Sequence, residues 1–132
     1  MAEVDVRPFE EDGDDAVGIA RLATTVQWPS LTDAEVVRRV CTAPGSVAYV
    51  ARSQGALVGW AQALGDGVLQ SHLSFVAVHP GHRGRGLARL LVQATFQATG
   101  TLRMDLVTDG AEGFYAGFDH QPMSGFRIYP GR

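Results

Sequence analysis

The sequence predicts a mixed α/β fold in which helices pack on one central sheet. Two observations lead to this prediction. Strand-like and helix-like periodicities alternate along the chain, and three strand patterns joined by short turns occupy residues 46–78. With 132 residues, 45% of them apolar, folding can bury roughly two-thirds of the unfolded surface in one core. No repeat, low-complexity tract or linker interrupts the chain, and we expect a single domain over residues 1–132.

The first third of the chain has the pattern of one strand followed by two helices. Residues 4–9 alternate in polarity and are expected to form the first strand. An aspartate cap then precedes a helix that runs to about residue 25. Thr32 and Glu35 have the spacing of a capping box, so a second helix is expected to begin there and to run to about Cys41.

The middle of the chain changes to a strand period. Residues 46–52, 57–64 and 69–78 are expected to form three strands. The turn signals at 53–55 and 65–67 are short, as in hairpins. These segments therefore predict an antiparallel meander.

The remaining residues return to a helical period and then alternate again. An amphipathic helix is expected over residues 84–98 and a strand over 102–107. A short helix over 111–117 and a last strand over 126–129 complete the pattern. The strand–helix–strand unit over 69–107 should form a right-handed crossover, which makes the sheet a mixed one.

Charge and cysteine content exclude several classes of protein. A net charge of −3 excludes a strongly basic protein that coats nucleic-acid phosphates. The single cysteine, Cys41, excludes an internal disulfide framework, and no apolar run approaches the roughly 18 residues of a membrane helix. All 11 basic residues other than histidine are arginine, which points to a GC-rich bacterial genome. We expect a cytoplasmic protein with neither nucleic acid nor membrane as a partner.

Residues 75–88 are the most specific stretch of the sequence. An apolar strand runs into a glycine-rich turn, and the turn opens an amphipathic helix. Free backbone N–H groups at a helix start, together with the helix dipole, form an anion site. Arg83 and Arg85 add charge suited to phosphate, so a diphosphate is the natural ligand. The chain has no lysine for a Walker A loop, and Arg89 stands where a dinucleotide fingerprint needs a small residue. A plain glycine turn before a helix is the alternative.

Arg83-x-x-Gly86-x-Ala88 resembles the Gln/Arg-x-x-Gly-x-Gly/Ala signature of the GNAT superfamily of acyl-CoA-dependent N-acyltransferases. Residues 76–80 resemble the strand that leads into this signature, and the element order is similar to that of the family over nearly the whole chain. The resemblance implies a GNAT fold, a mostly antiparallel twisted sheet of about six to seven strands flanked by about four helices. It also implies acetyl-CoA as cosubstrate, with an oxyanion donor in the backbone near Val76. The cofactor-binding residues implied are Val76, Ala77, Val78, Arg83, Gly84, Arg85, Gly86, Leu87, Ala88 and Thr108.

A second segment, residues 114–122, is similar to the late Phe-Tyr-x-x-x-Gly-Phe-x-Pro segment of the same family. In that family the tyrosine often protonates the departing coenzyme A thiolate, and the resemblance gives this role to Tyr115. Asp119 and His120 replace the usual Gly-Phe. A tyrosine packed at a helix end is the alternative interpretation of Tyr115.

The amine acceptor of such a reaction needs a base, because an alkylammonium has a pKa of about 10 and must lose a proton before it attacks. The strand before the turn has no acidic residue. Alternation places His72, Ser74 and Val76 on one face, so His72 is a candidate base and Ser74 a candidate partner for a relay water. The pattern resembles the His-x-His of arylalkylamine acetyltransferases. A surface or half-buried strand histidine is the alternative, and His120 is a competing candidate base.

The resemblance places the acceptor site between the meander and the loop that joins the first two helices. The substrate-binding residues that it implies are Trp28, Trp60, Ser74 and Phe75. An aromatic lining favours an aromatic or apolar amine. His79 and His82 lack the further ligands of a zinc site, and we expect no metal.

Together these patterns predict an N-acetyltransferase that transfers an acetyl group from acetyl-CoA to the primary amine of a small molecule, by direct attack in a ternary complex. The alternatives are a protein or peptide N-acetyltransferase, an enzyme that uses a longer or acidic acyl-CoA, and a non-catalytic acyl-CoA-binding module. An exposed sheet edge makes a homodimer a further expectation.

Overall fold

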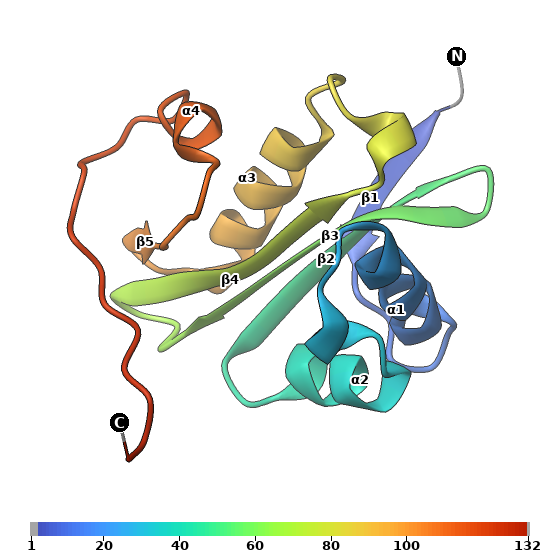
Figure 1. Cartoon of the computed structure of the whole chain (residues 1–132), viewed down its shortest axis with the longest axis horizontal. Helices are drawn as coiled ribbons and strands as arrows, with labels where there is room; N and C mark the ends of the chain where they lie inside the picture. The colour runs from blue at the N-terminus through green and yellow to red at the C-terminus, as the bar shows by residue number, and fades with distance from the viewer. Residues whose placement is uncertain (1–2, 132) are drawn as a thin grey trace.

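A computed structural model describes residues 3–131 and shows one five-stranded sheet with the order β1-β2-β3-β4-β5 (Figure 1). The first four strands are antiparallel to their neighbours, whereas β5 runs parallel to β4. This mixed sheet is the one that the crossover pattern predicts. The strands are β1 (Val4–Pro8), β2 (Ser46–Ser53), β3 (Ala56–Gly65), β4 (Gln70–Val78) and β5 (Arg103–Asp105).

Four α-helices and two short 3₁₀ turns accompany the sheet within the described residues. The helices α1 and α2 cover one face and α3 covers the other (Figure 1). The helices are α1 (Asp15–Thr25), α2 (Ala34–Thr42), α3 (Leu87–Thr99) and α4 (Glu112–Tyr115), and the 3₁₀ turns are η1 (Pro29–Leu31) and η2 (Pro80–His82).

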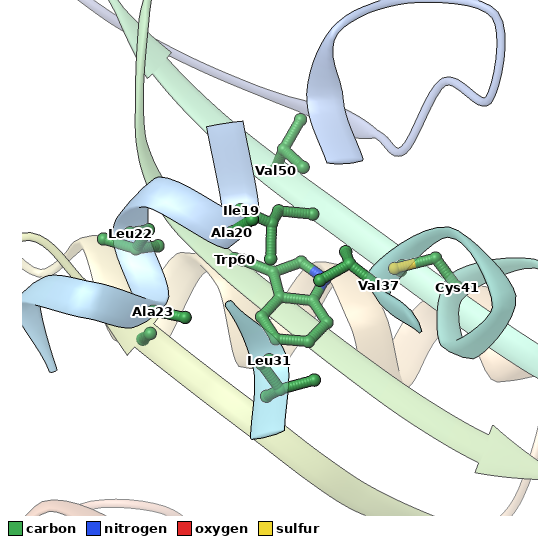
Figure 2. Packing of buried hydrophobic residues seen from close by; sticks show 11 residues of the cluster. Ile19, Ala20, Leu22, Ala23, Leu31, Val37, Cys41, Val50 and Trp60 are labelled. Atoms are coloured by element: carbon green, nitrogen blue, oxygen red, sulfur yellow. The ribbon is translucent and has the colours of Figure 1, made fainter. Parts of the chain in front are cut away.

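The alternation of β2 and β3 decides which side chains meet which helices. Val50 and Trp60 face α1 and α2, while their neighbours Ala51 and Ala61 pack toward α3. The indole ring of Trp60, which is 1% exposed, fills the space between α1, α2 and the sheet (Figure 2). Cys41 lies in the same cluster as a small apolar side chain, and burial raises the pKa of its thiol to about 12.

A buried carboxylate joins the N-terminal elements. Asp15, fully buried at the start of α1, accepts two hydrogen bonds from Arg7 at 2.8 and 3.0 Å. Arg52 of β2 donates to the same carboxylate at 2.8 Å, and the backbone N–H of Glu10 donates at 2.8 Å. These contacts tie β1, α1 and β2 together.

Two local expectations are wrong. Asp33, and not Thr32, caps α2: its Oδ1 accepts from the backbone N–H of Glu35 at 2.9 Å, while the Thr32 hydroxyl donates to the carbonyl of Pro29. Asp33 directly precedes the first helical residue, and from there its carboxylate reaches the free backbone N–H of Glu35, the second residue of α2. The last strand, over residues 126–129, does not form, so the sheet has five strands and not six or seven.

The segment after α4 runs past β5 and the start of β4 without joining the sheet (Figure 1). Phe126 is 90% exposed and Ile128 is 87% exposed. A strand pattern is realised only where a neighbouring strand completes its hydrogen bonds. This segment passes close to Val107, beyond the end of β5, and finds no such neighbour within residues 3–131.

Candidate functional site

The strand before the glycine turn, β4, contains a bulge. In the ladder between β3 and β4, Gln62 pairs with Phe75 while Ala63 pairs with Leu73. Ser74 is therefore the extra residue of β4, and the side chains beyond it change faces relative to a regular strand. Leu73 and Val76 both pack toward α3, whereas Phe75 packs among the residues beneath α1 and α2.

The bulge changes the face that alternation predicts for the candidate base. His72, which precedes Leu73, lies on the opposite face from Leu73 and Val76, the face on which Phe75 packs. Its register partner in β5 is Asp105. His72 is exposed.

Close to the bulge, β4 separates from β5. β4 and β5 pair at only three positions, and the last pair is His72 with Asp105. Beyond it β4 continues to Val78 with no strand beside it on this edge, within the described residues. Apart from the Val78 carbonyl, which accepts a hydrogen bond from Arg83, the backbone groups of this edge have no strand partner and can bind an extended ligand in the manner of an added strand.

A cleft of about 440 Å³ opens at this separation. Its walls include Phe75 and Trp28 from the face of α1 and α2, and Leu73 and Tyr115 from the face of α3. The cleft thus joins the two faces of the sheet. Its lining residues are Trp28, Pro29, Ser30, Leu31, Leu73, Ser74, Phe75, Val76, Val107, Thr108, Asp109, Ala111, Tyr115 and Arg127.

Three aromatic rings contact one another in a row on the face of the sheet that α1 and α2 cover. The Phe75 ring lies 5.5 Å from that of Trp28, tilted by 56°, and 5.3 Å from that of Trp60, nearly parallel to it. Trp28 and Phe75 line the cleft, whereas Trp60 lies behind Phe75 in the core and outside the lining. Trp60 therefore supports the wall and does not form its surface.

The turn at the end of β4 is open and cationic. Gly84 and Gly86 have φ values of +78° and +76°, and a Cβ at either position would meet nothing within 4 Å. Glycine is thus required by backbone conformation, and the space beside the turn is free. Gly86 precedes α3 and offers no side chain to cap its first N–H groups. Arg83 donates through Nε to the carbonyl of Val78 at 3.2 Å, and the Arg85 side chain is exposed.

Tyr115 stands at the C-terminal end of α4 beside the cleft. Its ring packs in a T-shaped arrangement against Phe114, 4.8 Å away between centroids. Burial raises the pKa of the Tyr115 phenol above its ordinary value of 10.0, so the hydroxyl is protonated at neutral pH. Thr108, on the same wall, accepts a hydrogen bond from the backbone N–H of Ala111 at 3.2 Å just before α4 begins.

Comparison with known proteins agrees with this geometry. A sequence profile of the acetyltransferase (GNAT) family matches residues 10–118. The chain belongs to the GNAT acetyltransferase family. A search of curated protein sequences found no significant match.

Solved structures show the GNAT fold over almost the whole chain. A GNAT-family protein from Xanthomonas campestris pv. campestris is 26% identical, with a TM-score of 0.76 over 99% of this chain and 96% of that one. The aminoglycoside N-acetyltransferase AAC(6')-Iy in complex with CoA is 20% identical, with a TM-score of 0.75 over 98% and 97%. A ribosomal-protein-alanine N-acetyltransferase from Brucella melitensis biovar Abortus 2308 is 19% identical, with a TM-score of 0.72 over 98% and 100%.

Six of the sequence-predicted site residues line one cleft, and the others lie outside its lining. Trp28, Ser74, Phe75, Val76, Thr108 and Tyr115 line one cleft. His72 lies outside the lining, although it is next to Leu73, which belongs to it. His120 is exposed on the segment after α4, where its Nδ1 lies 2.8 Å from the carbonyl oxygen of Phe118.

Arg127 is the one charged side chain at the cleft, among the described residues, that sequence reasoning missed entirely. It lies beyond the second motif, on the segment for which alternation predicts a strand, and no local pattern indicates that its side chain reaches the cleft. Asp109 also lines the cleft, and its position directly after Thr108 is the one sequence feature that indicates this.

Residues 3–131 contain neither a candidate membrane helix nor a cluster of candidate metal ligands. No helix there combines the length and apolar character needed to cross a membrane. No group of three His, Cys, Asp or Glu side chains lies together as metal ligands would.

Proposed function

We propose that this GNAT domain transfers an acetyl group from acetyl-CoA to the primary amine of a small molecule. The observation that carries the proposal is the cleft through the sheet. It opens where β4 loses its neighbour after His72, on the strand that leads into the arginine-glycine turn at residues 83–86. One ligand can extend from the turn along the free edge of β4, while a second reaches the same point from the aromatic face.

Acetyl-CoA binding is assigned to the turn and the edge that follow the cleft. The free N–H groups over residues 83–88 and the dipole of α3 would hold the diphosphate, with Arg83 and Arg85 supplying positive charge. The backbone of residues 76–78 would pair with the pantetheine arm, since no strand occupies this edge. Thr108 faces this arm from the other wall of the cleft.

The reaction follows as direct attack in a ternary complex. The neutral amine attacks the thioester carbon, a C–N bond forms and the C–S bond breaks. A backbone N–H near Val76 would stabilise the oxyanion. Tyr115 would donate its proton to the departing thiolate, because it lines the cleft and its raised pKa holds the phenol protonated.

His72 would act as the base that removes the proton of the incoming ammonium, through a relay water. His72 is adjacent to the cleft residue Leu73, and Ser74, two residues after the histidine, lines the cleft. A relay water is needed because the histidine itself does not line the cleft. His120 is the competing base on the segment after α4.

The residues that line the cleft indicate the chemical class of the acceptor amine. Trp28 and Phe75 form an aromatic surface that Trp60 supports from behind, and such a surface fits an amine with an aromatic or apolar body. One carboxylate, Asp109, lines the cleft. A polycationic acceptor would need a more acidic surface than this.

A non-catalytic acyl-CoA-binding module is the second candidate function. The exposed position of His72, outside the cleft lining, favours it, because no base then contacts the acceptor directly. We further propose a single catalytic domain that works in a bacterial cytoplasm. The all-arginine basic composition and the single buried cysteine support this setting. The exposed edge at β5 supports a homodimer.

Calorimetric titration with acetyl-CoA and with desulfo-CoA tests the binding step. Saturable binding of both is expected, and absence of both would contradict the enzyme and the module alike. Thiol release from acetyl-CoA on addition of 2-phenylethylamine or other aromatic amines then separates the two. Binding without acceptor-dependent thiol release would support the module.

A further inference from the structure

One cation lines the cleft, and it comes from the segment after α4. Among the lining residues that the structure describes, Arg127 is the only lysine or arginine and Asp109 is the only carboxylate. Within residues 3–131, neither side chain takes part in an ion pair shorter than 4.0 Å. A guanidinium and a carboxylate without protein partners at one cleft are available to a ligand.

A close contact holds the segment that carries Arg127. A Cβ on Gly125 would lie 2.5 Å from Cγ1 of Val107, a residue of the cleft wall. Real Cβ atoms do not approach that closely, so a larger residue at this position would force Val107 or the segment to shift. Arg127 follows two residues later, and its place at the cleft depends on this contact.

We propose that Arg127 selects an acceptor amine that also carries a carboxylate, as an aromatic α-amino acid does. The inference rests on the proposed acetyl transfer and names its acceptor class. The planar guanidinium would bind the carboxylate with two parallel hydrogen bonds. Asp109 would attract the ammonium group on entry, and Trp28 with Phe75 would receive the aromatic body.

The charge of the lining agrees with a zwitterionic acceptor. One guanidinium and one carboxylate leave the cleft with no net charge. A cationic amine without a carboxylate would meet Arg127 unpaired, and the repulsion would weaken its binding. A carboxylate could also enter on the acyl chain of an acidic acyl-CoA, and the experiment below separates these two sources.

The test compares phenylalanine with 2-phenylethylamine, which share a ring and an amine and differ in the carboxylate. Thiol release from acetyl-CoA gives kcat/KM for each. The wild-type protein should prefer phenylalanine, and Arg127→Gln should reduce the ratio of the two kcat/KM values by about 10- to 100-fold, the range for a charged hydrogen bond. Arg103→Gln, which removes an exposed arginine that bonds to Gln70 away from the cleft, should leave the ratio unchanged.

A second variant tests the position of the segment rather than the charge. Gly125→Val keeps Arg127 but cannot keep the contact with Val107. It should reduce the ratio as Arg127→Gln does, with little change in melting temperature, because the segment contributes no strand to the sheet. A normal ratio in both variants would overturn the proposal.

Two further outcomes would also overturn it. Preference of the wild-type protein for 2-phenylethylamine would show that the carboxylate is not recognised. Arg127-dependent turnover of succinyl-CoA with 2-phenylethylamine would place the carboxylate on the acyl group and not on the acceptor.

A binding measurement keeps the test independent of turnover. With CoA present, N-acetylphenylalanine should bind more tightly than N-acetyl-2-phenylethylamine, and Arg127→Gln should remove the difference. If no amine releases thiol but this difference is found, acetyl transfer fails while the carboxylate site stands. Equal binding of the two compounds would overturn the site.

Discussion

The guanidinium of Arg89 lies 4.4 Å from the ring centroid of Phe118, and its Nη1 donates to the carbonyl of Gly117 at 3.0 Å. These contacts join α3 to the residues that follow α4. The Phe118 ring in turn packs on Phe114 and Tyr115. Arg89 therefore holds the short helix that presents Tyr115 to the cleft, although it does not line the cleft itself.

Loss of this arginine should affect turnover more than cofactor binding. In Arg89→Gln we expect kcat to fall roughly five- to tenfold, because a charged hydrogen bond and a cation–π contact together hold the helix with about 2 kcal/mol. KM for acetyl-CoA should change by less. Steady-state kinetics measure kcat and KM separately. Arg89→Lys serves as the variant that keeps the positive charge but loses the planar guanidinium group. An equal loss in Arg21→Gln, an exposed arginine on α1, would contradict a specific role.

Replacement of Tyr115 by Phe should lower kcat by about 100-fold, the usual scale of a general acid, while acetyl-CoA still binds. Burial raises the pKa of the Tyr115 phenol above 10.0. An acid must be protonated to act, so wild-type activity should fall at high pH only above that value. Tyr115→Phe should remove this dependence. Tyr49→Phe, on β2 and away from the cleft, is the matched control. Unchanged turnover in Tyr115→Phe would remove the acid role.

The strand, turn and helix around the diphosphate site could be predicted because the signals are local. Gly84 and Gly86 are required by the backbone conformation of a single turn, and the period change at α3 follows at once. The bulge at Ser74 could not be predicted in the same way. It depends on how β3 aligns with β4, and it moves His72 to the face opposite Val76.

The segment after α4 is a second part of the chain whose structure could not be predicted from its local sequence. Residues 126–129 alternate as a strand does, but whether they pair depends on a neighbouring edge that the local pattern does not contain. The same dependence hides Arg127, whose approach to the cleft rests on the contact between Gly125 and Val107. Local patterns therefore led to the proposed cofactor turn, whereas tertiary packing decides which other residues line the cleft.

Gly86→Ala should weaken acetyl-CoA binding by about tenfold, since a left-handed alanine costs about 1–2 kcal/mol and shifts the N–H groups of the turn. Calorimetric titration measures the change. Gly67→Ala is a matched control, because Gly67 has the same φ of +76° and the same open surroundings on a turn far from α3's first residues. It should lower stability without lowering affinity. Equal affinity losses in the two variants would contradict the assignment of the diphosphate to the turn.

Asp15→Asn should destabilise the fold by about 3–5 kcal/mol, because it leaves Arg7 and Arg52 without their buried partner. Burial by itself would raise the pKa of Asp15, but its hydrogen bonds from Arg7, Arg52 and Glu10 lower it below 3.8. The stabilisation is thus full above pH 3.8 and is lost as the pH falls through the folded-state pKa. Urea denaturation at pH 7 and pH 3 checks this. The acid loss should shrink in Asp15→Asn and persist in Asp14→Asn, whose carboxylate is exposed.

His72→Gln should lower kcat/KM for amines, because most of an alkylamine arrives as the ammonium ion and a base must remove its proton before attack. Steady-state kinetics over a series of pH values check the change. His120→Gln is the matched comparison, because His120 bonds to its own segment through Phe118 and lies outside the cleft lining. A profile altered only by His120→Gln would move the base to the segment after α4. A profile altered by neither would leave proton removal to water, and the amine would then react in the fraction that arrives neutral.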